Sequence, residues 1–263
     1  MAEESKFPTE IIELPSKGYF YPKENPLSSG KVEMRYMTAR EEDILTSPNL
    51  LKQGIAVDKL LETLIVDKKI NLDDILIGDK NALTISARIL GYGKEYEFTF
   101  TTEDGDEMSG TVDLTTLKEK EMDFSKYTKG INEFSFTLPN SKRVITFKLG
   151  TQKEEKEIDK ELVALKKISK GVNYQMTTRM KKIITSVDGD DGVAYINSFV
   201  DKEFLSQDAL AFRKHLTSVT PDVDMMATVK GEDGMEREVA VVLTAQFFWP
   251  TAWTQTVNTR RTI

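Results

Sequence analysis

The chain has 263 residues, 39% of them hydrophobic and 30% charged, so it can bury a core and is not compositionally disordered. It contains no cysteine, which excludes a disulfide framework, a cysteine-ligated zinc site and a cysteine nucleophile. Its net charge is -7, and acidic and basic residues are mixed along the sequence. This pattern argues against a dedicated surface for nucleic acid or for an anionic membrane.

The first ten residues, MAEESKFPTE, are polar and acidic, unlike the basic start and apolar run of a signal peptide. No apolar stretch approaches the roughly 20 residues that a membrane-spanning helix needs. We therefore expect a soluble protein that is not secreted by a standard route.

Three consecutive aromatic residues, Tyr19, Phe20 and Tyr21, follow a short extended arm and the turn-like Ser16-Lys17-Gly18. Side chains alternate in an extended segment, so the three rings cannot all enter one core. Two interpretations are open. Either Tyr19 and Tyr21 pack on their own domain while Phe20 occupies a groove, or the arm docks on a neighbouring subunit.

A half-buried strand and several helices are predicted next. The strand is Val32–Tyr36, where apolar and charged residues alternate. Capping-box spacing predicts a helix that begins at Thr38, and Pro48 is placed to restart it. Asn71 and Asp79 are candidate N-caps of two further helices, the second ending near Gly91 and Gly93. A stripe of apolar residues at helical spacing lies between Pro48 and Asn71: Val57, Leu60, Leu61, Leu64 and Ile65.

Beyond Gly93 the hydrophobic period changes to two, which predicts hairpins. One hairpin is expected over Tyr96–Leu114 and a second over Phe134–Leu149. A third pairs Met225–Val229 with Val239–Leu243 across a turn of Glu232, Asp233 and Gly234. The order of helix, strand, Asp-Gly turn and strand thus occurs twice, at Ala82–Leu114 and Ala209–Leu243, which suggests an internal repeat, although coincidence is an open alternative.

Between the second and third hairpins the pattern is helical again. An apolar seam that ends at Gly171 predicts a helix from about Glu154. Two more helices are expected at Tyr174–Val187 and Gly192–Leu216. We predict an α+β fold with helical segments and several antiparallel hairpins. Its expected parts are an N-terminal arm with the first strands (1–37), a helical and hairpin half (38–150), a second helical half that ends in a hairpin (151–250) and a C-terminal tail (251–263).

No constellation of residues predicts catalysis or metal binding. The single histidine, His215, has no carboxylate or nucleophile evident near it in the sequence. The acidic run Asp188–Gly192 fails as an EF-hand loop, because Phe199 stands where the bidentate glutamate is needed, and we interpret it as a helix–helix turn. Gly91-Tyr92-Gly93 lacks the remaining residues of a phosphate-binding loop. We predict no catalytic residues, no metal and no cofactor.

Four peptides in a fixed order carry a resemblance to a known family. They are IELPSKGYFYP at Ile12–Pro22, VEMRYMTAREEDIL at Val32–Leu45, ARILGYGKEYEF at Ala87–Phe98 and QFFWP at Gln246–Pro250. Together they resemble the T4-type bacteriophage baseplate protein family, which supplies the hub or hub-assembly subunit of contractile tails. Members often carry Cys-x-x-Cys pairs at hairpin turns near Thr102–Glu107 and Lys230–Gly234, and the absence of cysteine here puts a metal in those turns in doubt.

The resemblance implies a non-enzymatic subunit that contacts other baseplate or hub proteins in the virion, after assembly in the host cytoplasm. It implies no nucleic acid, membrane span or small-molecule substrate. An assembly factor that leaves before the virion is complete is the alternative, and an envelope-degrading enzyme or an unrelated binding module are the remaining ones. Aromatic and arginine residues are enriched at binding hot spots. The candidate partner-binding residues are Tyr19, Phe20, Tyr21, Phe247, Phe248, Trp249, Arg260 and Arg261.

Overall fold

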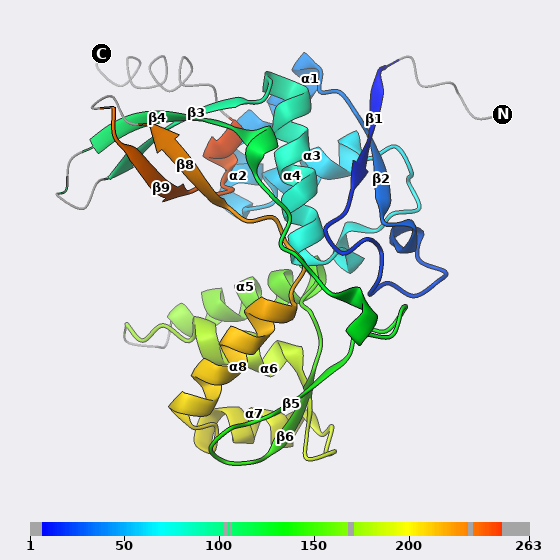
Figure 1. Ribbon diagram of the computed structural model, residues 1–263, viewed down its shortest axis with the longest axis vertical. Helices are drawn as coiled ribbons and strands as arrows, with labels where there is room; N and C mark the ends of the chain where they lie inside the picture. Colours follow the sequence, from blue (N-terminus) through cyan, green and yellow to red (C-terminus); the bar gives the residue numbers. More distant parts are fainter. Residues whose placement is uncertain (1–6, 102–104, 106, 168–170, 231–233, 249–263) are drawn as a thin grey trace.

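A computed structural model describes residues 7–101, 105, 107–167, 171–230 and 234–248 (Figure 1). The first half contains β1 (Thr9–Glu13), β2 (Lys31–Arg35), α1 (Ala39–Thr46), α2 (Pro48–Gln53), α3 (Ala56–Leu64), α4 (Ile77–Tyr92), β3 (Glu95–Thr101) and β4 (Glu107–Asp113). The second half contains β5 (Phe134–Thr137), β6 (Val144–Phe147), α5 (Gln152–Lys166), α6 (Gln175–Ile183), β7 (Ile184–Val187), α7 (Val193–Lys202), α8 (Ser206–Val219), β8 (Met226–Lys230) and β9 (Glu236–Ala240).

The fold is α+β, as predicted, and every sheet among the described residues is small and antiparallel. Three sheets are single hairpins, β1–β2, β3–β4 and β8–β9, and the fourth has the order β5–β6–β7. One apolar core runs through both halves and includes Leu14, Leu83, Phe147 and Phe212. The predicted domain boundaries stay a prediction.

Two groups of elements are seen in Figure 1. Helices α1–α4 lie with β1–β4 and with the late hairpin β8–β9, while α5–α8 lie with β5, β6 and β7. The chain therefore crosses between the groups twice, in the connection 115–133 and again after α8. The strands β5 and β6 lie with the second group of helices, since β6 pairs with β7.

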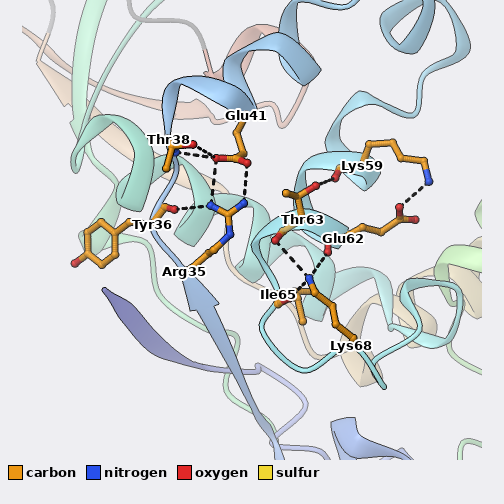
Figure 2. A network of polar contacts seen from close by, with 9 residues as sticks. All are labelled: Arg35, Tyr36, Thr38, Glu41, Lys59, Glu62, Thr63, Ile65 and Lys68. Atoms are coloured by element: carbon orange, nitrogen blue, oxygen red, sulfur yellow. Dashed lines mark hydrogen bonds and ion pairs between the residues drawn. The ribbon is translucent and has the colours of Figure 1, made fainter. Parts of the chain in front are cut away.

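Strand β2 and helix α1 form where the sequence predicts a strand and a helix. Val32 and Met34 are buried on β2, while Glu33 between them is exposed. Thr38 and Glu41 form the predicted capping box at the start of α1. At the end of α3, the Lys68 ammonium donates to carbonyl oxygens there, including that of Ile65 at 2.6 Å (Figure 2).

Two predicted helix caps differ from the structure. Asn71 does cap through its side chain, but the element is the three-residue 3₁₀ turn Leu72–Asp74 and not a longer helix. Asp79 is not an N-cap: α4 begins at Ile77, and Asp79 is its third residue, fully buried. Tertiary contacts hold Asp79 inside α4, where its carboxylate accepts hydrogen bonds from Ser16 and Tyr21.

The predicted helix Tyr174–Val187 is wrong at its end. Helix α6 stops at Ile183, and Ile184–Val187 form the strand β7, because their backbone pairs with β6. The acidic turn after it therefore joins a strand to a helix. The predicted helix Gly192–Leu216 is two helices, α7 and α8, with a break at 203–205.

The hairpins β3–β4 and β8–β9 pack against each other through β4 and β8. Gly110 lies at this contact: a Cβ added there would overlap the side chain of Val229. Gly110 lies within β4, where it pairs with Phe98. Close approach between the hairpins, and not turn geometry, is the reason for this glycine.

Candidate binding surfaces

Phe20 is a core residue that joins distant segments of the chain. Its side chain is 2% exposed, and its ring meets those of Phe124, Tyr127 and Phe134 at centroid distances of 6.0, 5.6 and 5.3 Å. The Tyr19 hydroxyl donates to the carbonyl oxygen of Tyr127 at 2.9 Å. The aromatic arm is thus packed against the connection 115–133 and against β5.

Tyr21 belongs to a buried hydrogen-bond network at the start of α4. Its hydroxyl donates to Asp79 Oδ2 at 2.6 Å and accepts the Leu76 N–H at 2.9 Å. Asp79 also accepts from the backbone N–H and the hydroxyl of Ser16. Burial raises the pKa of Asp79, and the hydrogen bonds from Ser16 and Tyr21 only partly oppose this. Burial and the nearby Asp79 charge raise the pKa of Tyr21.

Phe247 and Phe248 are fully buried at the end of the described chain. The Phe247 ring lies 4.8 Å from that of Tyr96, and its carbonyl oxygen accepts from Arg88 Nε at 3.2 Å. The other candidate residues of this region, Trp249, Arg260 and Arg261, lie outside the described residues.

All the described candidate residues therefore have intramolecular contacts, and their role in partner binding stays a prediction. The sequence analysis did not single out the side chains that are most available to a partner. The exposed large apolar residues of the described chain include Phe7, Ile11, Val172, Tyr174, Met176, Val193 and Leu210.

Strand β1 presents one edge to solvent. The Leu14 N–H donates to the carbonyl oxygen of Gly30, and the Tyr36 N–H donates to that of Pro8. Because hydrogen-bonded pairs alternate along an antiparallel ladder, the backbone groups of Thr9, Ile11 and Glu13 point away from β2. Among the described strands, β1 pairs only with β2. The Ile11 side chain is 63% exposed. Such an edge is suited to pairing with an extended segment of another chain.

A second apolar surface lies on the opposite group of helices. Met176 on α6 contacts Arg213 on α8 through its sulfur, at 2.7 Å from Nη1. Leu210, 47% exposed, is one turn before Arg213 and so on the same face of α8. Arginine beside exposed apolar groups is a common composition of protein interfaces.

A cavity of about 540 Å³ lies between the two groups of helices. Its floor holds a charged network: the Lys80 ammonium lies 2.5 Å from Asp58 Oδ1, and Gln152 Nε2 donates to Asp58 Oδ2 at 2.8 Å. These residues come from α3, α4 and α5. The network therefore satisfies its own charges and joins the two halves.

Among the described residues, the titratable groups do not form an arrangement typical of catalysis. The His215 ring stacks on Phe136 at 4.5 Å and meets Phe147 edge-on at 5.8 Å, and burial lowers its pKa. This is the environment of a packing residue. Within the described residues, no group of His, Cys, Asp and Glu side chains could hold a metal ion. No helix in that part of the chain has the length and apolarity needed to cross a membrane.

The fold and its surfaces thus define a protein with sheet edges and apolar patches suited to contacts with other chains. Residues 12–207 match the family of the T4 bacteriophage base plate protein, so the chain belongs to that family. The family places the protein in the tail baseplate of the virion and supports a structural role. No curated protein and no solved structure matches the chain.

Proposed function

We propose that the protein is a non-enzymatic structural subunit in the hub region of a contractile-tail baseplate, and that it acts through contacts with other hub proteins. The family match over most of the chain carries this proposal. The half-buried ring of His215 stacks on Phe136, and Asp58 is paired with Lys80, which agrees with a role in binding. Assembly takes place in the host cytoplasm before the particle is released.

The test is an amber mutation in the gene for this chain, followed by electron microscopy of the infected lysate. We expect heads to accumulate while complete baseplates and tails are missing, and suppression of the mutation to restore them. Normal tails on infectious particles made without the chain would contradict the proposal.

We propose the outer edge of β1 as one partner surface. An extended segment of a neighbouring hub protein would pair with the outward backbone groups of Thr9, Ile11 and Glu13 and cover the Ile11 side chain. Charged side chains on an edge strand oppose such pairing. Ile11→Lys should therefore weaken incorporation of the chain into particles, roughly tenfold for a loss of about 1.4 kcal/mol.

The matched control is Val193→Lys on α7, a position that is 73% exposed and lies in the other group of helices. Both variants are supplied in trans to the amber mutant, and their thermal unfolding is compared first. Equal incorporation of Ile11→Lys and wild-type chain would exclude this edge as the partner surface.

A further inference from the structure

The two halves of the chain repeat the same turn. The first hairpin leaves its strand through Leu14-Pro15-Ser16-Lys17, and β5 leaves through the sequence LPNSK at residues 138–142. Both lysines have the left-handed backbone conformation that a non-glycine residue seldom adopts, with φ of 50° at Lys17 and 61° at Lys142.

The same type of residue anchors each turn. Asp79 is the third residue of α4 and Asp208 is the third residue of α8, and both are fully buried. Asp79 accepts from the backbone N–H of Ser16 at 2.9 Å. Asp208 accepts from the backbone N–H groups of Asn140 and Ser141 at 2.7 and 3.0 Å. In each half, a helix thus begins with an aspartate that holds the preceding hairpin turn.

The repeat continues without a gap through the strand that follows and up to the start of the next helix. Residues 30–38 align with 143–151, and each segment ends in the threonine of a capping box. A cation three residues before that threonine binds the capping glutamate. Arg35 Nη2 lies 2.7 Å from Glu41 Oε1 (Figure 2), and Lys148 Nζ lies 2.6 Å from Glu154 Oε1.

A second gapless alignment pairs residues 76–114 with 205–243, which in each half form a helix and a hairpin. Gly105 and Gly234 occupy the same position in the two hairpin turns, with φ of 90° and 80°. The buried side chains of Leu83 and Phe212 also correspond. The identical pairs include Leu76 and Leu205, Asp79 and Asp208, Ala82 and Ala211, Val112 and Val241, and Leu114 and Leu243.

One segment of the first half has no counterpart in the second. Lys17 and Lys142 correspond, as do Gly30 and Arg143, so residues 18–29 are additional. The ends of this segment touch, because a Cβ at Gly30 would lie 2.5 Å from the carbonyl carbon of Lys17. The shorter turn of the second half could therefore be recovered by joining the two ends.

We infer that the chain is an internal duplication of one unit, residues 9–114 and 134–243, and that residues 18–29 are a strap, inserted in the first unit, that fixes its orientation to the second. The strap carries Phe20, whose ring packs on Phe134 of β5. It also carries Tyr19, whose carbonyl oxygen accepts the Gly130 N–H at 2.8 Å.

The strap and the cavity floor join the units at different places. At the cavity, the ties are polar: Gln152 N–H donates to Ile75 at 2.9 Å, Ile77 N–H donates to Gly150 at 3.2 Å, and Asp58 binds Gln152. The strap adds an apolar tie through Phe20. Without it, the polar ties and the contact of β4 with β8 would remain, and α5–α8 would turn about them. The surfaces at Ile11 and Leu210 would then lose their fixed spacing. This inference does not depend on the proposed function.

Because the chain has no cysteine, two spin labels can be attached at Lys52→Cys on α2 and Lys202→Cys on α7. Pulsed electron–electron double resonance then measures the distribution of distances between the two labels. We expect one narrow distance distribution for the full chain. Phe20→Ala should broaden it, while Leu210→Ala, an exposed control, should leave it unchanged. An unchanged distance distribution for Phe20→Ala, with native circular dichroism, would contradict the inference that the strap fixes the orientation of the two units.

A second variant removes Gly18–Ser29 and inserts an asparagine before Ser16, which recreates the turn of the second unit. The duplication predicts that this shortened chain keeps its helical circular dichroism and shows the broadest distribution. The duplication and the role of the strap would both be contradicted if the shortened chain unfolds while Phe20→Ala stays folded and keeps a narrow distance distribution.

Discussion

Glu41 illustrates how a fully buried carboxylate is kept charged. Burial raises its pKa, but hydrogen bonds from Arg35 and from the side chain and backbone of Thr38 outweigh this and lower the pKa from 4.5 to about 2. The sequence predicted the capping box of Thr38 and Glu41. It did not predict Arg35 as a partner, because that contact depends on how β2 leads into α1.

The pH dependence of stability follows from this shift. A carboxyl whose pKa is lower in the folded than in the unfolded chain contributes stability above pH 4.5 that is lost as pH falls toward 2. Glu41→Gln should lower the free energy of unfolding by about 2–3 kcal/mol at pH 7 and flatten the loss of stability in acid. Denaturant unfolding at pH 7, 4 and 3 measures both effects.

The control is Glu62→Gln, which removes an exposed pair with Lys59 one turn away on α3 (Figure 2). Exposed pairs of this kind contribute about 0.3–0.5 kcal/mol. Equal effects of the two substitutions, or an unchanged acid limb for Glu41→Gln, would show that the Glu41 network does not stabilise the charge.

Tyr21 makes a second prediction at this scale. Its hydroxyl both donates to Asp79 and accepts from Leu76, so Tyr21→Phe leaves a buried carboxylate oxygen and a buried N–H without that partner. We expect a loss of about 1–3 kcal/mol in the free energy of unfolding. Tyr36→Phe, on a half-exposed ring, should change it by less than about 0.5 kcal/mol. A Tyr21→Phe protein as stable as the Tyr36→Phe protein would contradict the network.

At the scale of elements, the hairpins β3–β4 and β8–β9 depend on a close approach at Gly110. Gly110→Ala places a methyl group against Val229, and overpacking of this kind costs about 1–3 kcal/mol. Val229→Ala in the same chain should recover part of that loss, because it makes room for the methyl group. A double-mutant cycle of unfolding free energies measures the coupling. Additive effects would show that the hairpins do not meet at this position.

The elements also show what local sequence can and cannot predict. Alternation identified all three predicted hairpins, and a capping box identified the start of α1. The apolar seam predicted α5 from about Glu154, whereas the helix begins at Gln152. The strand β7 was missed because Ile184–Val187 follow a helical pattern without punctuation, and only pairing with β6 makes them extended. The β-branched residues Ile184, Thr185 and Val187 were the available signal.

For the whole molecule, the order of the four peptides along the sequence predicted the family correctly. Residue type predicted the binding surface less well. The aromatic residues Phe20 and Phe247 suggest an interface by type, yet both are buried. Their burial depends on contacts with Phe134 and Tyr96, which are far away in the chain. Ile11 carried no signal of its own, because its exposure follows from the pairing of β1 on one side only.

Quantitative mass spectrometry of gradient-purified phage particles, compared with infected-cell lysate, tests the central claim most directly. A structural baseplate subunit should be present at a small fixed number of copies per particle and should remain after repeated purification. Abundance in the lysate with absence from the particles would contradict a structural role and would identify the chain as an assembly factor that leaves the hub.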